Sequence, residues 1–335
     1  MDLALSPDQL DLRSGLVGFL AAEWTPGRLR AAASAPALDR PAWRRLAELG
    51  LFGVAVPERA GGMGLGWADA AILCEELGRF LVPGPLVPSL LAAERVPGVL
   101  TGERVVALVD GRDPAALAEH LPGATHLVVV ADSGLTLHPV DEVAAAVAET
   151  PLDPLTPVAA VVEYRGAGER IGTAEDAGRW RERGALLTAA LQTGVARGAL
   201  ELATRYATER VQFGGVIGSF QAVKHLLAEA LVRVDLARAA VLVAALTLDE
   251  DGARNVDEAG DEAVAAAKVL ADDAAGTNGR TCVQVHGGMG FTWEVLAHLY
   301  LKRAWVQETA FGTADEHALR VAATLPDAPP PDGGG

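Results

Sequence analysis

The spacing of apolar side chains changes twice along the chain, and these changes divide it into three parts. Within residues 1–98, apolar positions recur at helical intervals, and Ser6-Pro7 fits an N-cap followed by proline at the first helical position. The segment PAWRRLAELG indicates a second helix that stops at Gly50. WADAAILCEELGRF indicates another helix after a Gly-rich loop. The sequence therefore predicts an N-terminal helical domain over residues 1–98.

The middle part, residues 99–177, loses the helical interval. Its apolar residues gather in short β-branched runs, RVVALVDG, THLVVVAD, LTLHPV and PVAAVVEY, separated by Gly, Asp and Pro. Runs of this length and composition are typical of strands. We therefore expect a small antiparallel β-domain over 99–177.

Helical spacing returns over residues 178–325. One long helix is expected from near Trp180 to Arg210, where RVQFGGVIGS interrupts it with three glycines. Serine is a favoured N-cap residue, so Ser219 is expected to cap the next helix, which runs to about Leu248. These two helices indicate the start of a helical bundle.

A third bundle helix is expected over roughly 256–286, although Gly276 and Gly279 weaken the prediction for its second half. After the Gly-rich turn HGGMGFTW, a last helix or helix pair continues to about Leu325. Long helices with short connections indicate a C-terminal four-helix bundle. The low-complexity tail PDAPPPDGGG, residues 326–335, is expected to be disordered. The predicted fold is therefore mostly α with a small β-domain.

Composition excludes several classes of function. The net charge is −16 over 335 residues, with no visible basic patch, so nucleic acid and anionic membranes are not expected as partners. No run of eighteen apolar residues and no signal-peptide pattern is present. Cys74 and Cys282 lie in unrelated segments without metal-ligand spacing, which predicts reduced thiols, no metal site and a cytoplasmic protein.

The first loop with candidate chemistry is RVQFGGVIGSFQAVKH, residues 210–225. The guanidinium of Arg210 is a planar fork of donors that suits a phosphate, and the glycines allow the backbone to approach a ligand. Phe213 could pack on a flat ring, and Gln221 lies at the start of the next helix. The alternative is an ordinary helix corner with a solvated arginine, which composition alone favours.

Two further loops are informative only together with the first. In VQVHGGMGF, Gln284 ends a helix and Gly287-Gly288 again permits close backbone approach. His286 is either a catalytic base or a structural histidine beside a glycine turn, and the structural role is favoured. A structural role, as a loop followed by the start of a helix, is enough to explain the segment PERAGGMGLGWADAAILCEELGR.

In combination, three segments resemble the acyl-CoA dehydrogenase family over nearly the whole chain. They are PERAGGMGLG before the helix ending EELGR, then RYATERVQFGGVIGSFQAVKHLLAE, then VQVHGGMGFTWE. The resemblance implies an N-terminal helical domain, a middle β-domain and a C-terminal four-helix bundle, assembled as a dimer of dimers. It also implies FAD, an acyl-CoA thioester as substrate, and an electron-transfer flavoprotein or similar acceptor.

The chain departs from the family at the positions of the catalytic base, which removes a proton from the substrate. In the family a glutamate removes the α-proton of the thioester while the flavin takes hydride from the β-carbon, and only an anion in a dry pocket can serve. The matching turn here reads AFGT, so Phe311 stands where most members have the base. Gly184 stands at the alternative position used by other members. Glu308 and Glu182 are the nearest carboxylates that could replace it.

The resemblance implies that one half of the cofactor site is retained. Its members would be Arg210, Phe213, Gln221, Gln284, Gly287, Gly288 and Thr313. The segments that cover the flavin ring in the family have no match, and no Trp occurs between Trp67 and Trp180, which indicates a shortened β-domain. In the family, the Arg/Phe/Gln loop and the Gln-x-x-Gly-Gly turn hold the ADP end of FAD bound mainly to the neighbouring subunit.

This pattern is similar to the short subunit of heteromeric α2β2 acyl-CoA dehydrogenases of bacterial steroid side-chain degradation. In those complexes a longer subunit carries the catalytic glutamate. One alternative is a homo-oligomeric dehydrogenase with a relocated base, Glu308 or Glu182. A flavin-free structural protein on the same scaffold is the other alternative.

Overall fold

The computed structural model describes residues 3–113, 115–250 and 258–325. The tail for which disorder was predicted, 326–335, lies outside the described residues. Helices form both ends of the sequence and two small sheets form its middle, so the predicted mostly helical fold with a small β-domain is confirmed. None of the described helices combines the length and the apolar character needed to cross a membrane.

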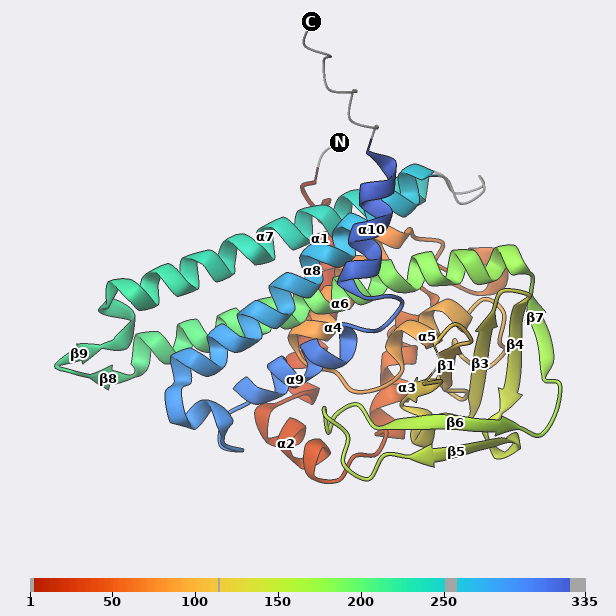
Figure 1. The fold of residues 1–335 in the computed structure, drawn as a ribbon, viewed down its shortest axis with the longest axis horizontal. Helices are drawn as coiled ribbons and strands as arrows, with labels where there is room; N and C mark the ends of the chain where they lie inside the picture. The colour runs from red at the N-terminus through yellow and green to blue at the C-terminus, as the bar shows by residue number, and fades with distance from the viewer. Residues whose placement is uncertain (1–2, 114, 251–257, 326–335) are drawn as a thin grey trace, which may run out of the picture.

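The N-terminal part consists of short helices around an apolar centre (Figure 1). Its helices are α1 (Pro7–Glu23), α2 (Pro26–Ser34), α3 (Arg40–Glu48), α4 (Trp67–Arg79) and α5 (Leu86–Ala92). Ser6 caps α1 as predicted, in a reciprocal capping box with Gln9. Gly50 follows α3 with a left-handed φ of 80°, which glycine adopts without steric cost. Helix α2, whose N-cap is Thr25, was not predicted from the sequence.

Helix α4 packs on the first bundle helix almost backbone to backbone. A Cβ atom on Gly194 would lie 1.9 Å from the carbonyl oxygen of Glu75, and one on Gly78 would lie 2.0 Å from that of Leu191. Both glycines are therefore required by the close approach of the two helices. Gly78 is the glycine of the EELGR motif, so this motif has a packing role.

The middle part contains two sheets. Its strands are β1 (Val106–Asp110), β2 (Leu117–Glu119), β3 (His126–Ala131), β4 (Gly134–Pro139), β5 (Val143–Val147), β6 (Val158–Tyr164) and β7 (Glu169–Gly172). One sheet has the order β1-β3-β4-β7 and the other β2-β6-β5. The strands lie within the predicted range, and its limits, 99 and 177, stay a prediction. Strands β2, β5 and β7 were missed.

The prediction of a purely antiparallel domain was wrong for one pair. β1 and β3 are parallel, with Val106 opposite His126. Between them the chain leaves the first sheet, pairs as β2 with β6 of the second sheet, and returns. A parallel pair requires such a crossover, whereas a tight hairpin would have made the pair antiparallel.

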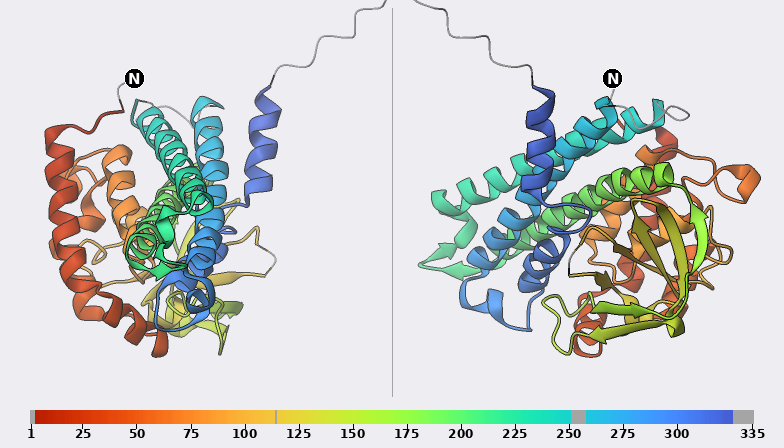
Figure 2. Two further views of the ribbon diagram at one scale, coloured as in Figure 1. Left: turned by 90° about the vertical axis from the view of Figure 1, so that its left-hand side faces the viewer. Right: turned by 45° about the vertical axis from the view of Figure 1, so that its right-hand side comes forward.

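The C-terminal part is a helical bundle. It contains α6 (Ala174–Glu209), α7 (Gln221–Glu250), α8 (Glu258–His286), α9 (Ala297–Gln307) and α10 (Ala314–Thr324). The connections are β8 (Val211–Gln212), β9 (Gly215–Val216), η5 (Ile217–Ser219) and η6 (Gly287–Phe291). Helices α6, α7 and α8 lie side by side along the molecule (Figure 1), and α10 packs on α8 and projects from the body (Figure 2).

Two details of the bundle differ from the sequence predictions, and a third, the helix expected over roughly 256–286, agrees with them. Helix α6 begins at Ala174, earlier than expected, because Thr173 and Asp176 form a capping box. Ser219 does not cap α7, since its Oγ donates instead to the carbonyl of Val216 at 2.7 Å. Helix α8 continues through Gly279, where an added Cβ would lie 2.9 Å from Cα of Leu301. That glycine marks close helix packing and not the end of the helix.

Candidate functional site

The turn between α9 and α10 contains two consecutive residues with left-handed backbone. Phe311 has a φ of 57° and Gly312 a φ of 103°. A left-handed conformation is unfavourable for a bulky residue, so tertiary contacts must hold it. One contact is a hydrogen bond of 3.0 Å between Nε2 of the fully buried His317 and the carbonyl oxygen of Phe311. Burial lowers the pKa of His317, so the neutral ring donates this bond.

The ring of Phe311 packs directly on α6. A Cβ atom placed on Gly184 would lie 2.2 Å from Cε1 of Phe311. The two positions at which the family resemblance expects a base therefore meet in space. Of the replacement candidates, Glu182 is buried on α6, two residues before Gly184, and Glu308 is exposed at the end of α9.

A buried lysine that the sequence analysis missed lies behind the same turn. Nζ of Lys268, on α8, is fully buried, 2.6 Å from Oδ2 of Asp272 and 3.4 Å from the carbonyl oxygens of Gln307 and Glu308. Burial lowers the pKa of Lys268 and raises that of Asp272 to about 6. The ammonium thus contacts the carbonyl end of α9, just before Phe311. The only signal in the sequence is one lysine in an otherwise apolar stretch, AVAAAKVLA.

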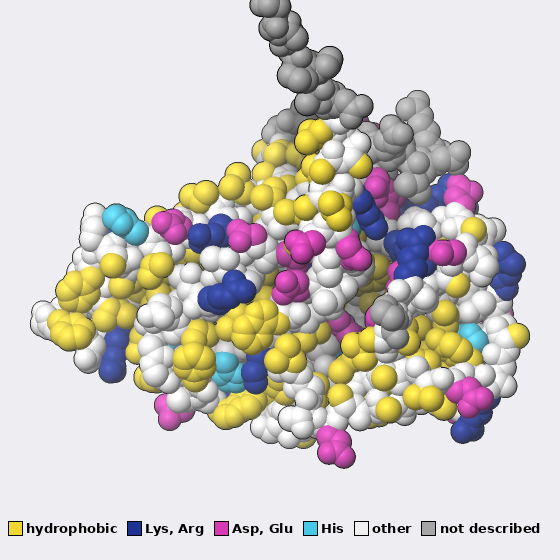
Figure 3. Space-filling view, viewed as in Figure 1, with side chains coloured by type: hydrophobic (Ala, Val, Ile, Leu, Met, Phe, Trp, Pro, Cys, Tyr) yellow, Lys and Arg dark blue, Asp and Glu magenta, His cyan; other side chains and the backbone are white. Residues whose placement is uncertain are grey.

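At the far end of the bundle, the predicted phosphate-binding loop forms a short hairpin (Figure 1). Strands β8 and β9 are joined by Phe213 and Gly214, both with positive φ, as a type I′ turn requires. The side chain of Phe213 is 92% exposed. Figure 3 shows hydrophobic side chains at this end of the molecule. A phenylalanine that is both exposed and in an unfavourable backbone conformation is typical of a binding surface.

Arg210 precedes the hairpin as the C-cap of α6. Its backbone is bonded on both sides, since its N–H donates to Tyr206 and its carbonyl accepts from Ile217 at 2.8 Å. Its exposed guanidinium makes no ion pair or hydrogen bond with any residue in the described ranges. The backbone is fixed while the charged group is available, which suits an anionic ligand.

Tyr206 connects this loop to the second predicted motif. Its ring stacks on His286 with 4.3 Å between centroids, and its hydroxyl lies 3.8 Å from Sδ of Met289 in η6. Nδ1 of His286 is bonded to the carbonyl of Cys282 in its own helix at 2.8 Å, which is a structural arrangement. The sequence analysis missed Tyr206, although its position one helical turn before Arg210 was a usable signal.

The Gln-x-x-Gly-Gly motif is open to solvent beside this stack. Gln284 is exposed on the last turn of α8, and Gly287 and Gly288 have no atom within 4 Å of an added Cβ. Gln221, also exposed, is the first residue of α7 after the hairpin. Thr313 lies elsewhere, at the N-cap of α10, where its hydroxyl and N–H are bonded to Glu316.

The structure therefore gathers six of the seven predicted cofactor-binding residues at one end of the bundle. They supply a guanidinium, two amide side chains, open glycine backbone and one aromatic ring. This set fits a pyrophosphate linked to a planar group. Among the residues that the structure describes, no cluster of His, Cys, Asp and Glu could hold a metal ion.

Comparisons with known proteins identify the family of the chain. Residues 181–325 match the model of the acyl-CoA dehydrogenase C-terminal domain, and residues 6–95 match that of the N-terminal domain. The chain is 35% identical over 306 residues to acyl-CoA dehydrogenase IpdE2 of Mycobacterium tuberculosis, covering 88% of this chain and 89% of IpdE2. It is 38% identical over 294 residues to FadE34 of the same organism, covering 79% of this chain but only 39% of that longer protein.

Two solved structures share the fold over nearly the whole chain. One is the ChsE4-ChsE5 complex from M. tuberculosis, with a TM-score of 0.82, 25% identity, and coverage of 98% of this chain and 100% of the other. The other is a variant of the Tcur3481-Tcur3483 steroid ACAD, with a TM-score of 0.81, 28% identity, and coverage of 94% and 97%. Together with the open loop at Arg210 and the two matching domain models, they show that this chain belongs to the acyl-CoA dehydrogenase family.

Proposed function

We propose that this chain is a subunit of an FAD-dependent acyl-CoA dehydrogenase that lacks the catalytic base and contributes an ADP-binding half-site to a partner subunit. The observation that carries the proposal is the contact between Phe311 and Gly184. It fills both family positions for the base with a hydrocarbon ring and a residue without a side chain. Neither can accept a proton.

The reaction needs two events at adjacent carbons of the acyl chain. A bound FAD would supply the acceptor for the hydride that leaves the β-carbon. The α-proton must go to an anion held close to that carbon, because a thioester α C–H is only weakly acidic. In this chain the two positions that the resemblance gives to such a carboxylate are Phe311 and Gly184, and they pack on each other. The subunit that removes the proton is therefore a different one, a longer acyl-CoA dehydrogenase chain that carries the glutamate.

The exposure of Arg210 and Phe213 supports the half-site. The guanidinium of Arg210 and the ring of Phe213 project from one end of the chain and meet no other described part of it, apart from the edge-on contact between Phe213 and Phe220. Residues that point away from their own subunit can hold a ligand that is seated on a neighbour. Arg210 would bind the pyrophosphate by charge-assisted hydrogen bonds, and Phe213 would pack on a planar group of the ligand.

The relatives support a proposal for the partner and the substrate. ChsE4 and ChsE5 form a complex, and the Tcur3481-Tcur3483 protein is described as a steroid ACAD. We accordingly propose an α2β2 heterotetramer, a CoA thioester with a steroid or similarly bulky acyl group, and an electron-transfer flavoprotein or a similar protein as acceptor.

A homo-oligomeric dehydrogenase with a relocated base is the second candidate. The observation in its favour is the position of Glu182, which is only 7% exposed and lies two residues before Gly184. Glu308 is exposed and thus lies in a less suitable environment for a base.

The two candidates are separated by anaerobic flavin reduction. The chain is produced alone and together with a longer acyl-CoA dehydrogenase subunit, reconstituted with FAD, and titrated with octanoyl-CoA and a steroid side-chain CoA thioester. We expect bleaching of the flavin only in the complex. If the chain alone bleaches its flavin, the base-free assignment is wrong, and loss of bleaching in Glu182→Gln or Glu308→Gln then identifies the base.

A further inference from the structure

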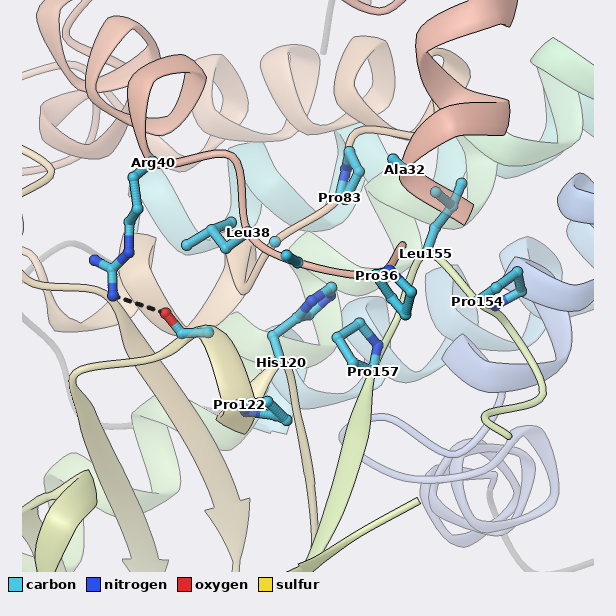
Figure 4. A pocket seen from close by; sticks show the side chains of 13 residues that line it. Ala32, Pro36, Leu38, Arg40, Pro83, His120, Pro122, Pro154, Leu155 and Pro157 are labelled. Carbon is cyan, nitrogen blue, oxygen red and sulfur yellow. Dashed lines mark hydrogen bonds between the residues drawn. The ribbon is translucent and has the colours of Figure 1, made fainter. Parts of the chain in front are cut away.

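A cavity of about 280 Å³ lies between the N-terminal helices and the β-domain (Figure 4). None of its lining residues belongs to the α9–α10 turn or to the Arg210 hairpin. One wall is the loop between α2 and α3, including Pro36 and Leu38, with Gly84 beside it. The opposite wall is formed by residues 120–123 after β2 and by the segment that leads into β6. Its volume is roughly twice that of an engineered apolar cavity that binds benzene.

The lining is apolar and rigid. Five prolines contribute to it: Pro36, Pro83, Pro122, Pro154 and Pro157. Proline has a fixed φ, so these walls lose little conformational freedom when a ligand binds, which favours affinity. Asp153, directly before Pro154, fixes one wall. It is fully buried and accepts hydrogen bonds from the backbone N–H of Leu155 and from Nε of Arg303.

One polar side chain points into the cavity. His120 is only 7% exposed, and its ring lies among Pro36, Pro157 and Leu38 (Figure 4). Within the described ranges its ring nitrogens have no hydrogen-bond partner, although its backbone N–H donates to the carbonyl of Pro157 at 2.5 Å. The cavity-facing ring nitrogens are thus available to a ligand that can donate or accept a hydrogen bond.

The backbone of His120 is also unusual. Its φ is 58°, a left-handed conformation that histidine adopts at a steric cost. This conformation ends β2 and turns the ring into the cavity. Residues held in such conformations cluster at binding sites, because the surrounding structure must maintain them.

We propose that this cavity binds a compact, uncharged apolar molecule that carries one hydroxyl group, with the hydroxyl hydrogen-bonded to His120. A neutral imidazole has one donor and one acceptor nitrogen, and a hydroxyl can complement either of them. Burial lowers the pKa of His120 to about 3, so the ring remains neutral at physiological pH. Apolar walls would penalise a charged ligand. Arg40 also lines the cavity, but it already donates to the carbonyl of Gly123 at 2.9 Å and points away from His120 (Figure 4).

The test uses the full chain and saturation-transfer NMR titrations with 4-ethylphenol as the probe. Ethylbenzene, which lacks the hydroxyl, is the matched ligand. We expect 4-ethylphenol to bind the wild-type chain roughly two- to twelvefold more tightly than ethylbenzene, the range for one neutral hydrogen bond. His120→Asn should remove this preference while the variant stays folded, because Asn tolerates a left-handed backbone.

His126→Asn is the matched control. His126 lies in β3 of the same domain, and its ring contacts Thr125 and not the cavity. This variant should bind 4-ethylphenol like the wild type. Three results would overturn the proposal: no binding of 4-ethylphenol up to its solubility, equal affinity in wild type and His120→Asn, or competition by FAD, which would make the cavity part of a flavin site. Tighter binding of 4-ethylbenzoate that is lost in Arg40→Gln would replace the hydroxyl ligand by a carboxylate.

Discussion

The ring of Phe311 lies against the bare Cα of Gly184, so closely that a Cβ atom on Gly184 would be 2.2 Å from the ring. The two residues are far apart in the sequence and belong to the α9–α10 turn and to α6. Each explains the other, because the ring can occupy this volume only while residue 184 has no side chain. A bulky residue with a φ of 57° is held there by the buried His317.

The first prediction concerns this contact. Gly184→Ala should lower the free energy of unfolding by about 1–3 kcal/mol, the usual cost of overpacking a core. Adding Phe311→Leu to this variant should recover part of the lost stability. Urea unfolding measures both. Gly178→Ala is the control, since Gly178 is in the same helix and has no atom within 4 Å of an added Cβ. It should be neutral or stabilising by roughly 0.5–1 kcal/mol. Equal effects of the two alanines would contradict the close contact.

The second prediction concerns Arg210. Arg210→Ala should weaken FAD retention by the heteromeric complex by about ten- to a hundredfold, because charge-assisted hydrogen bonds are each worth roughly 1.5–3 kcal/mol. Flavin content is measured after gel filtration at matched complex concentration. Arg59→Ala removes another exposed arginine, in the segment between α3 and α4, and should leave retention unchanged. Retention that is also unchanged in Arg210→Ala would mean that this loop does not contact the cofactor.

The third prediction separates fold from binding at the hairpin. Phe213 has a left-handed φ of 52° and a side chain that is 92% exposed, so Phe213→Gly removes steric strain and little packing. The chain alone should then be as stable as the wild type or more stable by about 1 kcal/mol. The same variant should retain less FAD in the complex. Thermal unfolding of the chain and flavin content of the complex give the two quantities, and undiminished retention would count against a binding role for Phe213.

The fourth prediction concerns Lys268 and pH. Burial already raises the pKa of Asp272 to about 6, above the ordinary carboxyl value, so the folded state binds this proton more tightly than the unfolded state. The contribution of Asp272 to the free energy of unfolding is therefore lost as the pH rises through its folded-state pKa of about 6. Lys268→Met removes the cation 2.6 Å away and should raise this pKa further. The variant should lose about 3–5 kcal/mol at pH 8 and clearly less at pH 5.

Urea unfolding at the two pH values measures this difference. Lys224→Met, at an exposed lysine on α7, should change the free energy of unfolding by less than about 0.5 kcal/mol at either pH. An equal loss at pH 5 and pH 8 in Lys268→Met would show that the protonation of Asp272 is not linked to the lysine.

Local signals in the sequence determined most of the helices. The Ser6 cap, the stop at Gly50 and the apolar period of α4 all act within a few residues, and each gave the element that the structure shows. The motif at Arg210 likewise indicated the family without any knowledge of packing. Capping and periodicity depend on neighbouring residues only, so they can be read from one chain.

Relationships between distant segments were decided by the tertiary structure. The parallel pairing of β1 with β3 depends on the crossover through β2, and the continuity of α8 through Gly279 depends on the approach of Leu301. The family resemblance assigns Phe311 and Gly184 to two positions where a base is expected, but the sequence did not show that the ring of one fills the space left by the other. Such contacts result from the packing of whole helices and sheets, and no local rule specifies which side chains then meet.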